Sequence, residues 1–498
     1  MSASRERKQR LAGDEVLAAK QEKAAQDATK AKRKTVVYIV IGIVCAILAA
    51  ALLIWNSGFF QSRATAYTVD GVNYTAAEYT YFYRTAYNQY ASYGMVSTST
   101  PLDEQVYNQE TGETFDDYFK TYAEESLKSL TLLSREAASE GMTLSDDEKA
   151  EIEDTIKSYK TSAAQYGYTL STYLKANFGP YMTEGKLRDL LEMQTLAGNF
   201  YNEKLAGFTY EQDELNAYYD ENAGTLDTFV HNTCFISSST DYFDTEDADE
   251  AKAQAKDLAD QMAAGLKDGG DFQALAEQYT KDQDNPTIYT NLTVPGSQLS
   301  SLYGDWLRDT ARKSGDVTVM ESSSGTGYFV VQFLDRYLLT DGTADIRHIL
   351  IKAETDEGAD APTAEQMAAA KAKVEELLAT WQSGEATEDS FAALANENSE
   401  DTGSNTNGGF YNAYRGQMIP NFDSWIFDPA RQTGDTGIVE NDNNGTEGYH
   451  LIYYVGSNTP YWQQQATSAL QDADMGEWLD GLMETLQTSS GSGMKYVG

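Results

Sequence analysis

The spacing of apolar residues along the chain predicts one uninterrupted apolar helix and several amphipathic ones. The run TVVYIVIGIVCAILAAALLIW, residues 35–55, holds 21 residues without a charged side chain, about the length of a helix that spans a bilayer. Apolar residues recur at helical spacing in four later segments, at about 115–140, 145–165, 182–205 and 211–222. The same spacing returns between Trp462 and Leu486, which predicts a C-terminal helix that packs on the N-terminal ones.

Local sequence patterns also predict a hairpin, the start of a helix and a frayed C-terminus. Two β-prone runs flank Asp70 and Gly71 in the segment AYTVDGVNYT, a turn sequence that favours a hairpin. Thr75 is expected to begin a helix, because Glu78 three residues later completes a capping box. The final segment, QTSSGSGMKYVG, is rich in Ser and Gly and is expected to fray.

The middle of the chain repeats itself. Four separate matches share a constant offset of 119 residues: Phe272 and Phe391, Gln298 and Gln417, Trp306 and Trp425, Gly315 and Gly434. One offset through four matches indicates two copies of one domain, at about 229–338 and 343–457. Each copy contains a strand, a helix, a short helix, a loop and further strands. The expected fold class is therefore α+β and multidomain, with a helical region over 66–228 completed by the returning helix 460–488.

Charge is distributed unevenly. The net charge is -40, and residues 1–34 hold ten of the 37 basic residues but five of the 77 acidic ones. The remaining acidic body argues against nucleic acid as a partner, because phosphate contacts need Lys and Arg. The basic stretch KAKRK at 30–34 directly precedes the apolar run and places the N-terminus in the cytoplasm. A retained single-pass anchor is favoured over a cleaved signal peptide, whose apolar region is shorter. The bulk of the chain is then extracytoplasmic.

Candidate chemistry is sparse. The sequence contains no phosphate-binding glycine loop, no Cys/His metal cluster and no nucleophile elbow, so neither a cofactor nor a metal is expected. Of three histidines, His348 lies in the first predicted strand of copy two and His450 in the last. Alignment of the copies places Thr233 and Phe329 at these positions in copy one, so both imidazoles are replaced together. This pattern favours a functional pair, although a structural pair joined across the sheet would also be lost together.

Three motifs of copy two carry a resemblance to a known family. RHILIKAE, GGFYNAYRGQMIPNF and GYHLIYY, in this order and spacing, resemble the parvulin family of peptidyl-prolyl cis/trans isomerases over about 343–457. The glycine segment is one residue shorter before RGQM than the commoner family pattern. The helical region together with the returning helix is similar to the chaperone domain of SurA-like and PrsA-type foldases.

The resemblance implies a site in copy two without a nucleophile or a cofactor. His348 and His450 would be the paired histidines beneath the pocket, and Asp401 would lie near the isomerising bond. The implied proline-binding residues are Met418 and Phe422 in the pocket, with Gln417, Phe427 and Phe410 near its edge. The loop KAETDEGADAPTAEQ after the first strand is acidic, so phosphorylated clients are not expected.

These inferences lead to two hypotheses. The first is a membrane-anchored foldase with chaperone activity that isomerises X-Pro bonds in secreted or envelope polypeptides. In it the second copy is catalytic, the first is degenerate, and the partners are unfolded proline-containing chains and the membrane. The alternative is a non-catalytic holdase in which both parvulin-like domains are structural. An adhesin or wall-structural protein would leave the histidine pair without a role.

Overall fold

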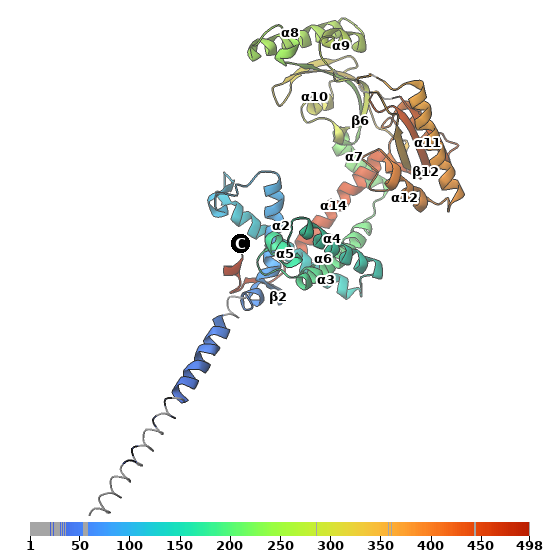
Figure 1. Cartoon of the computed structure of the whole chain (residues 1–498). Coiled ribbons are helices and arrows are strands. Elements are labelled where there is room, and N and C mark those ends of the chain that lie inside the picture. The colour runs from blue at the N-terminus through green and yellow to red at the C-terminus, as the bar shows by residue number, and fades with distance from the viewer. Residues whose placement is uncertain are drawn as a thin grey trace, which may run out of the picture. The chain divides into compact units, whose positions relative to one another are not determined.

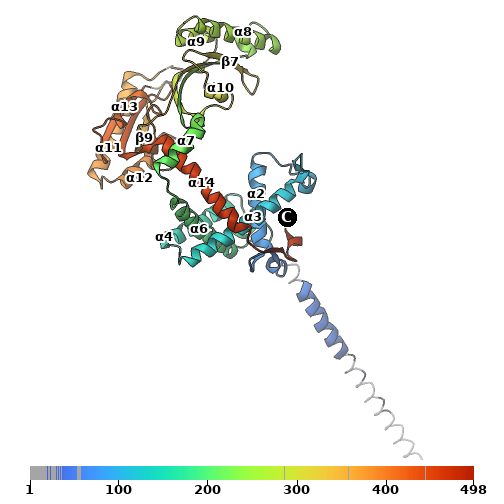
Figure 2. The ribbon, with the colours of Figure 1, turned by 180° about the vertical axis from the view of Figure 1, so that it is seen from behind.

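The chain divides into two compact units, Met1–Phe208 with Asp474–Gly498, and Thr209–Ala473 (Figure 1). The computed structural model describes, besides isolated positions between 20 and 34, residues 36–52, 58–284, 286–356, 358–359, 361–442 and 445–497. Figure 2 shows the same ribbon from behind.

The apolar run is only partly described. Residues 36–52 are helical, whereas most of the basic segment 1–34 and both ends of the predicted helix 35–55 lie outside the described residues. Within the part of the chain that the structure describes, no helix is both long enough and apolar enough to cross a membrane.

The first unit is mainly helical, as its amphipathic patterns predict. Its elements are β1 (Thr65–Val69), β2 (Val72–Thr75), α2 (Ala76–Ser92), β3 (Val106–Asn108), β4 (Glu113–Thr114), α3 (Phe115–Ser139), α4 (Asp146–Gln165), α5 (Leu170–Phe178) and α6 (Glu184–Ala206). The predicted hairpin is present as β1 and β2, and the capping box of Thr75 and Glu78 begins α2. Asp70 adopts a positive φ of 46° in the turn, which Asp tolerates better than most residues. The sequence reasoning did not identify α5 or the small β3–β4 hairpin.

The prediction of a frayed C-terminus is wrong. Residues Thr488–Ser490 form β13, which pairs antiparallel with β1 in a sheet of order β13-β1-β2. The backbone N–H of Gln487 donates to the Asp70 carboxylate, and Leu486 is buried in the core of the first unit. β1 would otherwise leave a row of unpaired backbone groups, and the tail satisfies them.

The second unit contains both repeats. Copy one comprises β5 (Thr228–Ser237), α8 (Ala248–Lys267), α9 (Phe272–Thr280), β6 (Ile288–Pro295), α10 (Gly304–Arg308), β7 (Val317–Glu321) and β8 (Gly327–Tyr337). Copy two comprises β9 (Gly342–Lys352), α11 (Ala364–Ser383), α12 (Glu388–Asn398), β10 (Phe410–Ala413), α13 (Pro420–Ile426), β11 (Thr436–Asn441) and β12 (Gly448–Pro460). The α+β, multidomain expectation is confirmed.

Each copy is an antiparallel four-stranded sheet between two helical layers. The strand orders, β6-β5-β8-β7 and β10-β9-β12-β11, are equivalent. In copy one, α8 and α9 pack on the sheet face that carries Cys234 and Val330, and α10 packs on the face of Val331 and Phe333 (Figures 1 and 2). In the same unit, α7 (Gln212–Leu226) packs on the start of α14 (Tyr461–Met483).

The central strands of the two copies share one register. In copy two, Lys352 at the end of β9 pairs with Gly448 at the start of β12. In copy one, Ser237 at the end of β5 pairs with Gly327 at the start of β8. These two pairs give a structural reference for comparing the copies position by position.

Counted from these pairs, Phe329 takes the place of His450, and Thr233 takes the place of His348. The alignment made from the sequence is therefore confirmed. In copy one the Phe329 ring packs on Phe235, with 4.9 Å between the ring centroids. An aromatic contact thus stands where copy two has an imidazole.

Gly409 lies against the backbone of His348 and leaves no room for a side chain. Its φ is +69°, and a Cβ there would lie 2.1 Å from the carbonyl oxygen of His348. We expect Gly409→Ala to lower the free energy of unfolding of this domain by about 3 kcal/mol, from left-handed strain plus overpacking. Gly434→Ala is the control, because Gly434 also has a positive φ but its Cβ would have only the Tyr453 hydroxyl at 4.0 Å.

The Gly434→Ala variant should lose only about 1 kcal/mol, the cost of the left-handed conformation. Calorimetric unfolding of the full-length variants measures both losses. Equal losses would show that the close approach of Gly409 to His348 is not a constraint.

Candidate active site

Two histidines from neighbouring strands meet on one face of the copy-two sheet. His348 comes from β9 and His450 from β12, and their Nδ1 atoms lie 3.0 Å apart. His450 pairs with Leu350, so His348 is its diagonal neighbour on the same face, within side-chain reach. Both are nearly removed from solvent, with exposed fractions of 5% and 8%.

Asp401 completes a buried polar network. It follows α12, and its Oδ2 lies 2.9 Å from Nε2 of His348. The hydroxyls of Ser404 and Tyr411 also donate to this oxygen, and the Gly403 N–H donates to Oδ1 at 3.1 Å. Hydrogen bonds from His348 first, and then from Ser404 and Gly403, hold the pKa of Asp401 well below its usual range despite partial burial.

The protonation of the network follows from these contacts. A carboxylate only accepts hydrogen bonds, so Nε2 of His348 carries the proton that it donates to Asp401. Burial, and then the neighbouring His348, lowers the pKa of His450 to about 3, which keeps this ring neutral near pH 7. When both rings are neutral, Nδ1–H of His450 donates to Nδ1 of His348.

A cavity of about 360 Å³ opens beside this network. Its apolar lining consists of Leu350, Tyr411, Met418, Ile419 and Phe422. The ring of Phe422 stands edge-on to both imidazoles, with centroid distances of 5.0 Å to His450 and 5.7 Å to His348. The histidine pair is therefore covered by an aromatic side chain and forms part of the cavity wall.

The residues expected at the pocket do not all reach it. Gln417, Met418 and Phe422 line the cavity together with His348, His450 and Asp401. Phe410 does not line it: Phe410 precedes Tyr411 on β10, and successive strand residues point to opposite faces. The Arg347 guanidinium lies 5.5 Å from its ring centroid. Phe427 is likewise absent from the lining, and its ring lies beneath Arg415 at 4.6 Å.

Two partners of Asp401 were missed by the sequence reasoning. Ser404 is fully buried and hydrogen-bonds to both Asp401 and His348. Ser404 follows Asp401 by only three residues, and this closeness in the sequence is the signal that could have identified it. Tyr411 lies inside the motif GGFYNAYRGQMIPNF, but its role depends on which face of β10 meets the cavity.

The network is not arranged as a metal site. Both ring nitrogens of His348 are within hydrogen-bond distance of protein partners. Over the residues whose positions are described, no group of three His, Cys, Asp or Glu side chains is placed to hold a metal ion.

Copy one has a different arrangement at the equivalent place. Its histidine, His231, lies two residues before Thr233 and is buried, with no hydrogen-bond partner for Nδ1 among the described residues. Burial lowers the pKa of His231 to about 4. The counterpart of Asp401 at the 119-residue offset is Asp282, which is exposed. Copy one therefore lacks the paired imidazoles and the buried carboxylate.

Comparison with known protein families matches both copies to the same kind of domain. A family model described as a PPIC-type PPIASE domain matches residues 348–456, and a second model with the same description matches residues 230–337. The chain therefore carries two parvulin domains of the PPIC type, one in each repeat. Only the second contains the complete His348–His450–Asp401 network.

The chain is also similar to SurA chaperones and PrsA-type isomerases. It is 26% identical to chaperone SurA of Chromohalobacter salexigens over 58% of this chain and 63% of that protein. It is 29% identical to chaperone SurA of Yersinia pestis over 41% of this chain and 43% of that protein. The match thus spans less than two thirds of either relative. The structure of peptidylprolyl isomerase PrsA from Bacillus anthracis matches with 12% identity and a TM-score of 0.19, covering 71% of this chain and 93% of that one.

His450 should make the stability of the second unit depend on pH. Its pKa is lowered from 6.5 to about 3, so the unfolded state binds this proton more readily. The stabilisation is complete above pH 6.5 and is lost as pH falls from 6.5 towards 3, by at most about 1.4 kcal/mol per pH unit. We expect His450→Phe to fold, since Phe329 stands at this position in copy one, and to show a weaker loss of stability on acidification.

Denaturant unfolding of the full-length protein between neutral pH and pH 4 measures this loss. His231, whose pKa is also lowered, contributes a slope of the same sign, so the measured quantity is the difference between wild type and His450→Phe. His231→Phe is the matched control and leaves the contribution of His450 in place. An identical pH slope in wild type and His450→Phe would contradict the assignment of a buried neutral imidazole.

Proposed function

We propose that the chain is a membrane-anchored, extracytoplasmic foldase that isomerises X-Pro bonds in secreted or envelope polypeptides. One observation carries this proposal: the hydrogen-bonded His348, His450 and Asp401 line the same cavity as the apolar side chains of Met418 and Phe422. The match of this region to a PPIC-type PPIASE domain supports the reaction class.

The reaction needs binding of a twisted amide and no covalent step. Rotation about the peptide bond costs about 18–20 kcal/mol because it removes the amide resonance. A site that binds the twisted form more tightly than either planar form lowers this barrier. Met418 and Phe422 would hold the proline ring in an apolar environment, while the preceding residue turns about the bond.

The polar network suits an electrostatic role. The low pKa of Asp401 makes it a weak base, and its oxygens are already occupied by hydrogen bonds, which disfavours proton abstraction or nucleophilic attack. Its charge and the imidazole dipoles are instead held in place before substrate arrives. Such fixed groups stabilise the charge redistribution of a twisting amide without reorganising during the reaction.

A groove in the helical unit supports chaperone activity beside isomerisation. It lies between α2, α3 and α6 and has a volume of about 560 Å³. Its lining includes Tyr81, Tyr122, Leu130, Leu133 and Tyr201. Tyrosine rings bury apolar area and offer a hydroxyl, which suits contacts with unfolded chains of varied sequence. The alternative function, a non-catalytic holdase, would use this groove alone.

The proposed location rests on the sequence. The charge-free run 35–55 follows the basic stretch 30–34, and the body of the chain is strongly acidic. A retained apolar helix with a basic N-terminal flank orients the N-terminus towards the cytoplasm. The second unit would then act on polypeptides outside the membrane.

Isomerase activity should depend on the network of copy two. NMR exchange on Ala-Pro peptides with the full-length protein measures the rate without a protease. We expect Asp401→Asn, and His348→Ala combined with Asp401→Ala, to lower the catalysed rate about a hundredfold or more, because preorganised charges are removed from the cavity. Asp389→Ala is the control: Asp389 is an exposed carboxylate of the same domain that does not line the cavity.

The same variants separate the two functions. Suppression of client aggregation by the double variant should match that of wild type, since the helical groove is intact. Wild-type protein that suppresses aggregation but shows no isomerisation above background would contradict the enzyme and support the holdase.

Membrane attachment has its own test. In cells that express the full-length chain, protein with an intact N-terminus should sediment with membranes and resist extraction by carbonate, because an apolar helix spans the bilayer. Protease added outside spheroplasts should digest the body. Replacing Gly42 and Ile43 with Arg places two charges in the apolar run and should release the protein from the membrane. Extraction of wild type by carbonate would contradict the anchor.

A further inference from the structure

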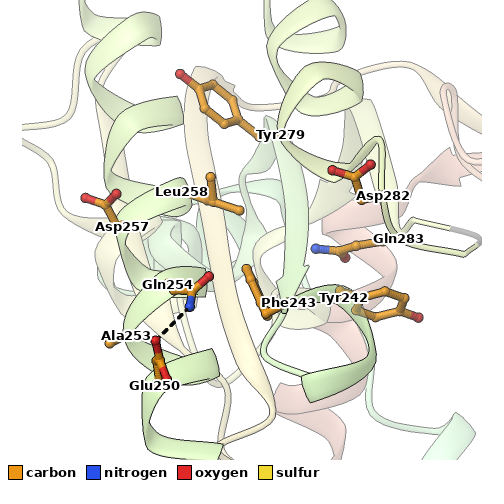
Figure 3. Close-up of a pocket in the computed structure, with 10 residues that line it drawn as sticks. All are labelled: Tyr242, Phe243, Glu250, Ala253, Gln254, Asp257, Leu258, Tyr279, Asp282 and Gln283. Atoms are coloured by element: carbon orange, nitrogen blue, oxygen red, sulfur yellow. Dashed lines mark hydrogen bonds between the residues drawn. The ribbon is translucent and has the colours of Figure 1, made fainter. Parts of the chain in front are cut away.

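A second cavity lies on copy one, apart from the histidine network. It is bounded by α8, α9 and the loop that contains Thr240–Tyr242, and it measures about 480 Å³ (Figure 3). We call it the α8–α9 groove. Its lining residues are Tyr242, Phe243, Glu250, Ala253, Gln254, Asp257, Leu258, Tyr279, Asp282 and Gln283.

The floor of the α8–α9 groove is apolar and firmly supported. Phe243, Leu258 and Tyr279 are half-buried and pack against the core of copy one, which includes Cys234 and Ile236. Because this core is covered by two helices and a sheet, the floor keeps its shape without a ligand. The exposed parts of these three side chains form an aromatic and aliphatic surface at the base of the groove. Concave sites with such a lining commonly bind apolar groups.

Carboxylates surround this floor. Glu250, Asp257 and Asp282 are exposed and line the groove, and Figure 3 shows Asp257 and Asp282 on either side of the apolar residues. Glu250 accepts hydrogen bonds from Thr245 and Gln254, which are neutral. Over the described residues, Glu250 has no ion pair, so no cation in this part of the chain neutralises its charge.

The lysines of the neighbourhood do not cancel these charges. Asp257 accepts only from neutral Gln261 in the described part of the chain. Lys252 pairs with Glu321, and Lys256 pairs with Asp260. Lys281 lies 4.0 Å from Asp282, but both side chains are largely exposed and such a pair is weak. The groove therefore combines an apolar floor with a negative rim, and this combination selects a ligand that is both apolar and cationic.

The α8–α9 groove is a feature of copy one. The buried positions Ala255, Ala259 and Met262 of α8 align with Ala370, Val374 and Leu377 of α11 at an offset of 115 residues. At that offset, copy two has Ala372 in place of Asp257 and Lys373 in place of Leu258. Copy two thus lacks one rim charge and has a cation in place of one floor residue.

We propose that the α8–α9 groove binds extended polypeptide segments in which Lys or Arg residues alternate with aliphatic or aromatic residues. The apolar side chains rest on Phe243 and Leu258, and the cationic ends reach Glu250 and Asp257. The aliphatic stems of Lys and Arg cover apolar surface while their charges stay at the rim, and they can stack on Tyr279. Copy one is then a polypeptide-binding domain that does not require proline.

Fluorescence anisotropy with the full-length protein tests the proposal. The probe is a labelled, proline-free peptide of alternating Lys and Leu, compared with a peptide in which Glu replaces every Lys. We expect the Lys peptide to bind more tightly, and added salt to weaken it. Glu250→Lys combined with Asp257→Lys should weaken binding of the Lys peptide about tenfold, because two attractive contacts become repulsive.

Asp268→Lys combined with Glu277→Lys is the matched control. It changes the net charge by the same amount at exposed positions of the same domain, outside the groove lining. This control should bind the Lys peptide within about twofold of wild type, since distant surface charges are screened by salt. Equal affinity for the two peptides, or equal losses in the two double variants, would overturn the proposal. Because the probe lacks proline, its binding is independent of isomerase activity.

Discussion

The candidate site depends on the antiparallel pairing of β9 with β12. His348 and His450 are 102 residues apart in the chain, and only this pairing brings their Nδ1 atoms to 3.0 Å. A slip of one residue would turn one histidine to the opposite face of the sheet. Gly448 permits the approach, because a Cβ there would lie 2.1 Å from the carbonyl oxygen of Ile351. The backbone geometry of these two strands therefore sets the relative positions of the two imidazoles.

The two repeats show that this framework and its chemistry are separable. Both copies keep the strand order and the register, yet copy one holds Phe329 and Phe235 in contact where copy two has a polar network. An aromatic pair fills the space and needs no hydrogen-bond partner. A buried imidazole is more stable with such a partner: His348 has Asp401, whereas Nδ1 of the buried His231 has none among the described residues. The fold therefore identifies the domain, whereas any proposed reaction must be argued from the residues of the site.

The local environments of Asp401 and His450 favour opposite charge states: Asp401 is charged and His450 is neutral. Asp401 stays charged because several donors converge on its oxygens, which outweighs its burial. His450 stays neutral because burial dominates for it, and among the described residues the only partner of its Nδ1 is another imidazole. The charged Asp401 and the neutral His450 imidazole lie beside an apolar wall. Their electric field is fixed by the protein and does not depend on the orientation of solvent molecules. The carboxylates at the rim of the α8–α9 groove differ from Asp401, because they are exposed to solvent. Dissolved salt therefore screens their attraction for cations.

The repeat, the α+β class and the start of α2 at Thr75 could be predicted from the sequence, because they rest on periodicity, a constant offset and a capping box. Comparison of the two copies showed only that both imidazoles are replaced together, and the pairing of His348 with His450 was implied by the family resemblance. Tertiary structure alone decided which side chains reach the cavity. Phe410 and Tyr411 are adjacent in sequence, and the face of β10 that meets the cavity admits only Tyr411. Likewise, the polar C-terminal tail became β13 because the edge of β1 was available to pair with it. Local composition carries no information about a distant strand edge or about which strand face a cavity meets, so these features required the folded chain.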